Sequence, residues 1–248
     1  MFRIIISVLC ASFFLTAAGA EPDNKAIQAA LARMFPGNDF GSLKVRPSAI
    51  PGLLEAEIDT SVFYVTPDGK HVVLGDLIDT QSRSNLSDQR RQTLIAKVIQ
   101  ELPEKNMIVL PVQNARRTIT VFTDVDCVYC RRMHLQDAAE LGRQGVKVRY
   151  LLFPRQGPGS ETYKRAVAVW CAADRVKAVG DAKAGKQIEM KTCPNPVDEN
   201  LALAEKLGVN GTPAIFLDDG RRTPGYVPAQ RLLALLGLDA KTSSPLVK

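Results

Sequence analysis

The stretch that decides the fold is Thr118-Ile119-Thr120-Val121-Phe122-Thr123-Asp124-Val125-Asp126-Cys127-Val128-Tyr129-Cys130. Its first five residues form an apolar run typical of a strand. The residues after Cys130 have the apolar spacing of a helix, and Gly142 predicts the end of that helix. The two thiols, Cys127 and Cys130, are therefore expected where a strand passes into the N-terminus of a helix.

This position has chemical consequences for the first thiol. The N-terminus of a helix presents unpaired N–H groups and the positive end of the helix dipole. Such surroundings lower a cysteine pKa from about 8.5 into the range of roughly 3.5–7.5. We therefore interpret the pair as a redox motif. Cys127, which is nearer the helix N-terminus, is the expected nucleophile, with an acidic and accessible sulfur, and Cys130 is the expected resolving thiol.

The N-terminus predicts export. Arg3 precedes an apolar run over residues 4–15, and small residues around Ala20 form a cleavage signal, so residues 1–20 have the pattern of a secretory signal peptide. The run is short for a membrane span, which needs about 20 residues. Four cysteines remain after Cys10 is removed, and an even number in an oxidising compartment predicts disulfide bonds.

The composition is that of an ordinary globular protein. The chain has 248 residues, of which 46% are hydrophobic and 23% are charged. The formal net charge of +6 is mild and the basic residues are scattered, so we expect no nucleic-acid partner.

After the signal peptide we expect a small first domain, residues 21–80. A helix over residues 24–34 and strands over 53–58, 61–65 and 71–74 are predicted, with a turn at 66–69. A piece of roughly 60 residues has little core of its own and often gains stability by pairing. An exposed strand edge would be a natural dimer contact.

Residues 81–105 are expected to form a linker. Ser87 is the predicted cap of a helix that Pro103 ends, with one apolar face at helical spacing. Pattern alone leaves two interpretations open, a helix packed on its own domain and an arm that sets the distance between two domains.

Residues 106–248 are expected to form the second domain. It has a predicted strand over 146–153, helices over 161–173 and 174–184, and a helix capped by Asp198 that ends at Leu207. A strand over 214–217, a short strand over 225–227 and a helix over 230–236 follow. This order indicates a mixed α/β (α+β) fold with a central sheet covered by helices.

The strand, the Cys-x-x-Cys helix and a late Gly-Thr-Pro before a strand resemble the thioredoxin fold. The closer resemblance is to the DsbC family of bacterial periplasmic disulfide isomerases. It is carried by the motif surroundings and by a series of short matches: Arg149-Tyr150-Leu151, Phe153-Pro154-Arg155-Gln156-Gly157, Trp170-Cys171-Ala172, Leu207-Gly208-Val209, Gly211-Thr212-Pro213-Ala214, Pro224-Gly225-Tyr226, Tyr64-Val65-Thr66 and Asp68-Gly69-Lys70-His71.

The resemblance implies an architecture and a set of partners. It implies a V-shaped homodimer with small cystatin-like dimerisation domains, helical linkers, and thioredoxin-like domains that carry a helical insertion. It implies a periplasmic enzyme whose clients are misfolded exported proteins with wrong disulfides, and a membrane reductase, DsbD, as electron source. The redox-active cysteine pair would need no cofactor.

Two departures from related patterns affect the thiols. The dipeptide between the cysteines is Val128-Tyr129, where the family's best-known pair is Gly-Tyr. Val121 occupies the place of thioredoxin's buried acid.

The resemblance also assigns the remaining site residues. Thr212-Pro213 would form a cis peptide bond that packs against the thiols and presents a backbone edge to the client. Cys171 and Cys193 form either a second redox pair or a permanent bridge. A bridge closing a loop of about 22 residues contributes on the order of 3 kcal/mol. The apolar helix around Cys171 favours the structural bridge, and the resemblance agrees with it.

Several other sites have poor support. Structural zinc needs two close cysteine pairs, so no metal is expected. Arg131 stands where haem attachment needs histidine. We interpret His134 as a helix-surface residue, and Asp124 and Asp126 as parts of a polar loop that could tune the thiols.

Two other functions remain open at this point. One is an oxidant, or a reductase of oxidised single cysteines as in the sister family DsbG. The other is a chaperone-like holdase in which an apolar cleft binds unfolded clients and the thiols are incidental.

Overall fold

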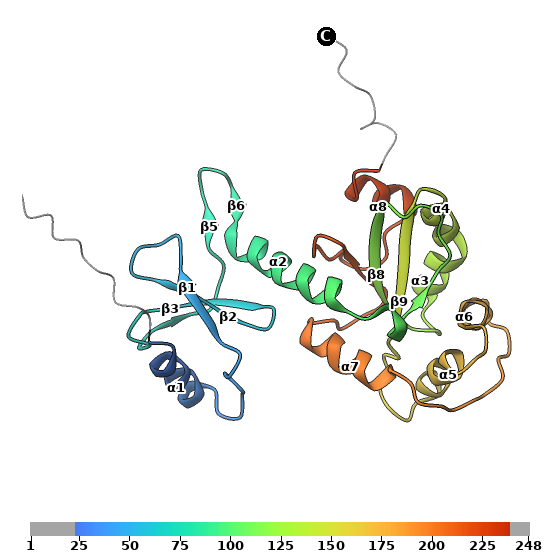
Figure 1. The fold of residues 1–248 in the computed structure, drawn as a ribbon, viewed down its shortest axis with the longest axis horizontal. Helices are drawn as coiled ribbons and strands as arrows, with labels where there is room; N and C mark the ends of the chain where they lie inside the picture. The colour runs from blue at the N-terminus through green and yellow to red at the C-terminus, as the bar shows by residue number, and fades with distance from the viewer. Residues whose placement is uncertain (1–22, 239–248) are drawn as a thin grey trace, which may run out of the picture. The chain divides into compact units, whose positions relative to one another are not determined.

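The computed structural model describes residues 23–238, so the expected signal peptide, residues 1–20, lies outside the described part. The chain divides into two compact units (Figure 1). One comprises residues up to Ala56 together with Tyr64–Val73, and the other comprises Glu57–Phe63 together with the residues from Leu74 onward. Between residues 23 and 238, no helix combines the length and apolar character that a membrane crossing requires.

The N-terminal part of the chain contains one helix and a four-stranded sheet. The helix α1 (Asn24–Met34) begins at Asp23, whose carboxylate accepts from two backbone N–H groups, and it buries Ile27 and Leu31. The sheet has the order β1-β2-β3-β4, with β1 (Lys44–Pro47), β2 (Leu54–Ile58), β3 (Ser61–Val65) and β4 (Val72–Val73). The expected helix and the strands β2 and β3 are confirmed. The strand β1 was missed because it is mostly exposed and carries two basic residues.

The predicted turn at residues 66–69 joins β3 to β4, which pair antiparallel. The Gly69 backbone N–H donates to the Thr66 carbonyl oxygen at 2.8 Å, the bond that closes a β-turn. Gly69 has φ of 67°, and a β-carbon added to it would lie 3.4 Å from the Ala30 side chain and 3.4 Å from the Ile27 backbone of α1. Glycine is needed here because a side chain would combine positive φ with close packing.

The segment expected to be a linker contains the expected helix and, before it, a hairpin that was not expected. A hairpin of β5 (Ile78–Asp79) and β6 (Ser84–Asn85) leads directly into α2 (Leu86–Glu101). The predicted cap was wrong. Asn85, not Ser87, accepts from the Asp88 N–H, whereas the buried Ser87 hydroxyl accepts from the Leu77 N–H at 2.8 Å.

The C-terminal half of α2 packs on the larger domain. Ile99 is buried in a cluster with Phe122 and Phe216, and Ile95, Val98 and Leu102 pack against the same cluster. This favours the interpretation of α2 as a helix packed on a domain over that of a free arm.

The larger domain is built on a sheet with the order β10-β8-β9-β7. The central strands β8 (Arg117–Thr123) and β9 (Val146–Leu152) are parallel. The outer strands β10 (Ala214–Leu217) and β7 (Ile108–Val109) are each antiparallel to their neighbour. A 3-10 turn, Glu104–Asn106, precedes β7. The expected central strands are confirmed, and β7 was missed because it has only two residues.

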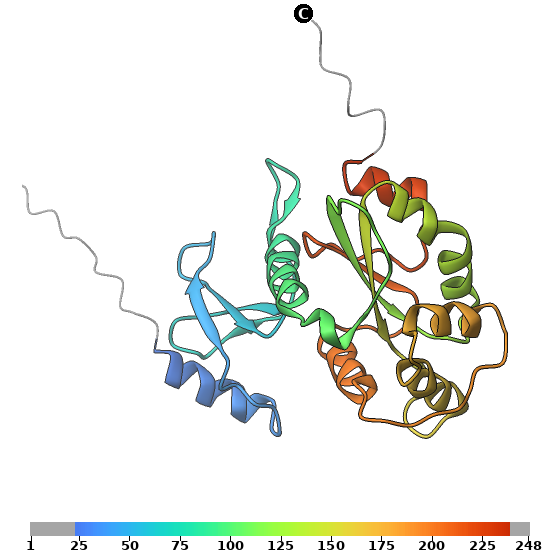
Figure 2. The same cartoon turned by 45° about the vertical axis from the view of Figure 1, so that its right-hand side comes forward.

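Helices cover both faces of this sheet. Side chains alternate along β8, so that Ile119 and Val121 enter one core cluster and Phe122 enters another. The first cluster is covered by α4 (Ala138–Arg143), α5 (Glu161–Trp170), α6 (Arg175–Lys183) and α8 (Ala229–Leu235). The second cluster is covered by α2 and α7 (Val197–Lys206), and Figure 2 shows the layers.

Three local expectations in the larger domain were wrong. Asp198 does not cap α7 but lies in its first turn, where it accepts from the Tyr163 hydroxyl at 2.8 Å. Residues 225–227 form no strand, and only one isolated bridge joins Phe216 to Arg222. Gly142 lies inside α4, and the reversal falls at Gly145, whose φ is 76°.

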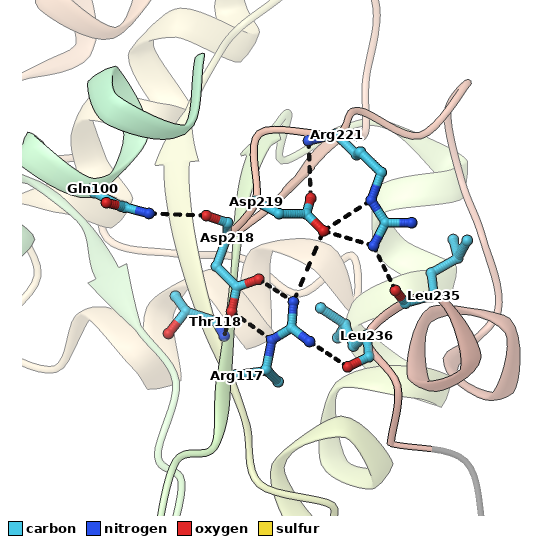
Figure 3. A network of polar contacts seen from close by, with 8 residues as sticks. All are labelled: Gln100, Arg117, Thr118, Asp218, Asp219, Arg221, Leu235 and Leu236. Atoms are coloured by element: carbon cyan, nitrogen blue, oxygen red, sulfur yellow. Dashed lines mark hydrogen bonds and ion pairs between the residues drawn. The ribbon is translucent and has the colours of Figure 1, made fainter. Parts of the chain in front are cut away.

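A network of polar contacts ties the start of β8 to the chain's last described helix (Figure 3). Arg117 binds the Asp218 carboxylate and the carbonyl oxygen of Leu236. Arg221 donates to the Leu235 carbonyl oxygen at 2.7 Å, and Gln100 of α2 donates to the Asp218 carbonyl oxygen at 3.1 Å. The turn after β10 thereby joins three elements that are distant in the sequence.

Candidate active site

The two thiols lie at the C-terminal end of β8. The strand ends at Thr123, and Cys127 is the N-cap of α3 (Val128–Arg132), as the sequence predicted. The Cys127 sulfur accepts from the Cys130 backbone N–H at 3.3 Å. One unpaired donor of the helix N-terminus is thus directed at the first sulfur.

The loop that contains Thr212 lies against the first thiol. The Thr212–Pro213 peptide bond is cis. In its protonated form the Cys127 thiol donates to the Thr212 carbonyl oxygen at 3.3 Å, so segments 85 positions apart meet at this sulfur. A cavity of about 280 Å³ lies beside the loop, and we call it the cis-proline groove; its lining includes Gly211, Thr212, Pro213, Arg222 and Pro224.

The thiols are less accessible than expected. Cys127 is 3% exposed and Cys130 is 1% exposed. The expectation of an open Cys127 sulfur was therefore wrong, because the Thr212 loop and the Cys130 backbone cover it. The intervening side chains are exposed instead, Val128 to 72% and Tyr129 to 58%.

The surroundings make the first thiol acidic. A hydrogen bond from the Cys130 thiol is the largest cause that lowers the pKa of Cys127, to about 5. The Cys130 backbone N–H and the positive charge of Arg155 act in the same direction, and burial opposes them. At neutral pH, the Cys127 side chain is a thiolate.

The second thiol has the opposite tendency. Burial raises the pKa of Cys130 well above the usual thiol range, and the negative charge on Cys127 adds to the effect. Only the positive charge of Lys183 and a hydrogen bond from Thr123 act against this increase in the Cys130 pKa. The structure therefore pairs an acidic thiol with a thiol held in its protonated form.

Asp124 organises the loop before the motif. It is 2% exposed and accepts from the backbone and side chain of Arg155, from the Asp126 N–H, and from the Thr162 hydroxyl, at 2.8 to 3.1 Å. Asp124 lies in the polar loop before the helix, as expected, but its carboxylate is buried. It holds Arg155 where the guanidinium acts on Cys127.

A π-helical turn, Met133–Asp137, follows α3. It brings Asp137 inward, where its carboxylate accepts from the Tyr226 hydroxyl and the Ala229 N–H, both at 2.9 Å. The Tyr226 ring stacks on Tyr129 with centroids 6.0 Å apart. The motif dipeptide is thus supported by the segment after β10.

His134 faces the interior, so its interpretation as a surface residue was wrong. Its ring lies beside Tyr150, with Nδ1 3.3 Å from the Tyr150 hydroxyl. Burial lowers the pKa of His134 to about 4, and the positive charge of Lys183 adds to this. His134 is neutral at physiological pH.

The other two cysteines form a disulfide bond, Cys171–Cys193, with α-carbons 5.8 Å apart. It closes a loop of 22 positions that contains α6. Within residues 23–238, no three side chains of His, Cys, Asp or Glu are grouped as a metal site requires.

The structure thus brings together Cys127, Cys130, Thr212 and Pro213, and it leaves Cys171 and Cys193 in a separate bridge. Sequence reasoning missed Thr123 and Lys183. Lys183 follows Val179 and Ala182 at the spacing of one helical face, which was a signal that its side chain points inward.

Comparison with known proteins gives consistent matches over both domains. Residues 103–238 match a family model described as a thioredoxin-like domain, and residues 18–88 match one described as the disulfide bond isomerase protein N-terminal domain. The chain is 36% identical over 225 residues to the thiol:disulfide interchange protein DsbC of Escherichia coli K12, covering 91% of this chain and 92% of the relative. It is 34% identical over 242 residues to the protein of that name from Salmonella typhimurium, covering 98% of each.

One solved structure agrees with these matches. A crystal structure of a disulfide interchange protein from Neisseria gonorrhoeae has a TM-score of 0.50 and 28% identity, and the match covers 55% of this chain and 96% of that one. Given the two family models and the relatives that match over most of its length, the chain belongs to the DsbC family of thiol:disulfide interchange proteins.

Proposed function

We propose that this protein is a periplasmic disulfide isomerase that rearranges incorrect disulfides in exported proteins through a mixed disulfide on Cys127. The observation that carries the proposal is the contrast between the two thiols. Cys127 is acidic and attacks as a thiolate, whereas Cys130 is held protonated and does not compete with it.

The reaction begins with the attack of the Cys127 thiolate on one sulfur of a client disulfide. A bond forms between Cys127 and that sulfur, the client disulfide breaks, and the second client sulfur leaves as a thiolate. This thiolate can attack another client disulfide, and a final attack on the mixed disulfide releases the client and restores the Cys127 thiolate. Isomerisation has then occurred without net oxidation or reduction.

Cys130 provides an exit when the client stalls. Its sulfur attacks Cys127, the Cys127–Cys130 bond forms, and the client leaves with a reduced thiol. The enzyme is then oxidised and needs an outside dithiol. We assign this role to a membrane reductase of the DsbD type, and no cofactor besides the cysteine pair is required.

The surface around the thiols supports client binding. Val128 and Tyr129 are exposed beside the covered sulfur, and the cis-proline groove opens next to the Thr212 backbone. We propose that an extended client segment lies along Thr212 and that the Thr212 loop shifts to uncover Cys127. The small volume of this groove fits a short peptide segment rather than a folded surface.

We further propose that the protein acts as a homodimer through its N-terminal domain. The strand β4 is the last in its sheet, so among residues 23–238 no strand lies beside this edge. Val73 and Leu74, at this edge, are 50% and 66% exposed. An open edge with exposed apolar residues favours pairing with a second copy.

The experiment is the recovery of activity from a client with scrambled disulfides. A multi-disulfide enzyme is oxidised in denaturant, diluted into the reduced mature protein, and assayed for its own activity. Wild type is expected to restore activity, and Cys127→Ser is expected to restore none. Cys130→Ser is the matched control, and it should retain partial activity in glutathione buffer because the first attack is intact.

The outcome also separates the other candidate functions. A DsbG-like reductase would reduce single oxidised cysteines but leave the scrambled client inactive. A holdase would suppress client aggregation equally well in the Cys127→Ser/Cys130→Ser double variant. The match to relatives that carry the DsbC name favours the isomerase.

A further inference from the structure

Lys183 is a charged side chain in an unusual place. It is the last residue of α6 and is 0% exposed. Lysine is almost never fully buried without an ionic partner, because burial of an unpaired ammonium is costly. Yet no carboxylate within residues 23–238 forms a salt bridge with Lys183 in this structure. Its Nζ instead donates to the Thr123 hydroxyl at 2.7 Å and to the Asp124 carbonyl oxygen at 3.1 Å.

Thr123 connects this amine to the second thiol. Its buried hydroxyl also acts on the second thiol, as a side-chain hydrogen bond to Cys130 that lowers the pKa of that thiol. Amine, hydroxyl and thiol thus form a continuous chain from α6 through the end of β8 to α3. Val121, on the same face of β8, is apolar and offers no acid or base.

The other charged groups near Lys183 have their own partners. Asp124 binds Arg155, and Asp126 forms an ion pair with Arg165. His134 is neutral, and the Tyr150 ring centroid lies 5.6 Å from Nζ. Burial has the largest effect on the pKa of Lys183 and lowers it. Negative charges on neighbouring groups act in the opposite direction, and in decreasing order these groups are Cys130, Cys127, Asp124 and Asp126.

An amine that burial drives toward its neutral form can accept a proton, and a thiol held protonated must lose one before it attacks. The resolving step therefore needs a base that is not in open solvent. Among residues 23–238, Lys183 is the basic side chain that the hydrogen bonds connect to Cys130.

We propose that Lys183 is a positioning residue for the resolving step, which takes up the Cys130 proton through the Thr123 hydroxyl when the mixed disulfide is resolved. This inference rests on the proposed function. In this step Lys183 starts as the neutral amine. The proton passes from the Cys130 sulfur to the Thr123 oxygen while the Thr123 proton passes to the free electron pair of Nζ, which becomes an ammonium. The resulting Cys130 thiolate forms the bond to Cys127, the Cys127–client bond breaks, and the client sulfur leaves with the electron pair and takes a proton from solvent.

The cycle closes on reduction. When an outside dithiol reduces the Cys127–Cys130 bond, the ammonium of Lys183 returns its proton through Thr123 to the Cys130 sulfur, and Cys127 leaves as thiolate. Lys183 thus sets how quickly a stalled client is released and leaves the first attack unaffected.

The test is a single-turnover reaction of the reduced, full-length mature protein with an equimolar aromatic disulfide, dithiobis(nitrobenzoate). Attack by Cys127 releases one coloured thiolate, and resolution by Cys130 releases a second. In K183M, we expect the first release to stay within about two-fold of wild type and the second to slow by about 100-fold at neutral pH, the low end of general-base effects.

Two further variants distinguish a proton acceptor from a structural role. K183Q keeps a donor to Thr123 but cannot take a proton, so its second release should be as slow as that of K183M. T123V interrupts the chain while it leaves Lys183 in place, and it should also slow only the second release. The second-release rate of wild type should level off with rising pH, whereas that of K183M and K183Q should keep increasing as hydroxide replaces the amine.

The results that overturn the proposal are distinct from a failure of the proposed function. A second release in K183Q and T123V within about two-fold of wild type would overturn the role of Lys183, because a base effect is larger than this. Absence of the first release in wild type would instead overturn the proposed function. If circular dichroism shows that K183M does not fold, the second-release rates of K183Q and T123V decide whether Lys183 has the proposed role.

Discussion

Two cysteines three positions apart differ in acidity because different groups surround each sulfur. Cys127 lies at the helix N-terminus and receives hydrogen bonds from the Cys130 thiol and backbone, next to the charge of Arg155. Cys130 points into the core, where burial favours its neutral form. This asymmetry orders the chemistry, since only the first sulfur is a thiolate when a client arrives.

The sequence predicted part of this site. The strand-to-helix position of Cys127 followed from local patterns, and the meeting with Thr212 followed from the family resemblance. Arg155 and Lys183 did not follow, because each acts from a distant segment. Arg155 could have been placed from topology, since β8 and β9 are parallel and pair Thr123 with Leu152, so the loops that follow both strands lie at one edge of the sheet.

Asp124 is expected to support this site through stability. Burial opposes its ionisation, but the N–H and guanidinium of Arg155 and the other donors lower the pKa of Asp124 overall. A carboxylate with a lowered folded-state pKa stabilises the fold above its unfolded pKa, and that contribution is lost as pH falls through the folded value. Asp124→Asn should reduce the free energy of unfolding by about 3 kcal/mol at pH 7.

Denaturant unfolding at several pH values measures this effect. The difference between Asp124→Asn and wild type should shrink as pH falls below about 4, because the unfolded chain then binds a proton at Asp124 while the folded carboxylate, with its lowered pKa, binds one only at lower pH. Asp126→Asn is the matched control on the other side of Val125. Its carboxylate is partly exposed in a single ion pair with Arg165, so it should cost less than about 1 kcal/mol. Equal effects of the two substitutions would contradict the role of Asp124.

At the scale of elements, the helix after the motif is not one regular helix. The π-helical turn, Met133–Asp137, inserts between α3 and α4, and it turns Asp137 toward Tyr226 and the start of α8. The sequence predicted a continuous helix because apolar spacing does not distinguish a one-residue insertion. Such turns are frequent at functional sites, and this one lies directly after the second thiol.

The packing of α2 on the larger domain depends on one glycine. Gly220, in the turn after β10, has φ of 86°, and a β-carbon there would lie 1.9 Å from the Gln92 carbonyl oxygen and 2.7 Å from the Ala96 nitrogen. Both contacts are backbone atoms of α2, so the clash cannot be relieved by a side-chain rotation. Gly220→Ala should therefore lower the free energy of unfolding by about 3 kcal/mol, from strain and overpacking together.

Gly208→Ala separates these two causes. Gly208 has φ of 63°, and a β-carbon added there would meet no atom within 4 Å, so this variant should cost only about 1 kcal/mol from backbone strain. Denaturant midpoints of both variants provide the measurement. If Gly220→Ala were as stable as Gly208→Ala, the close approach of α2 to this turn would be disproved.

At the scale of the whole molecule, the chain combines a sheet with an open edge and a larger redox domain. The sequence predicted both domains, because each has regular strands and helices with clear turn signals. It did not predict β1, β5, β6 or β7, since strands of two to four residues carry too few side chains to show an alternating pattern.

The open edge of β4 predicts how the oligomer can be broken. Leu74→Asp would place a charge beside Val73 on the proposed dimer edge, so we expect monomers in light scattering and loss of scrambled-client rescue. The first thiolate release with a small aromatic disulfide should persist, because Leu74 is not among the residues that contact the thiols. Ile50→Asp, at a 43% exposed position before β2, is the control and should leave the dimer intact. A dimeric Leu74→Asp variant would contradict the use of this edge.

The most direct measurement is the pH titration of thiolate in the reduced protein, followed by ultraviolet absorbance and by the rate of iodoacetamide alkylation. One thiolate per chain should be present at neutral pH, with an apparent pKa of about 5, and it should disappear in Cys127→Ser. If thiolate formed only near the ordinary thiol value of about 8.5, the disulfide exchange chemistry assigned to Cys127 would be contradicted.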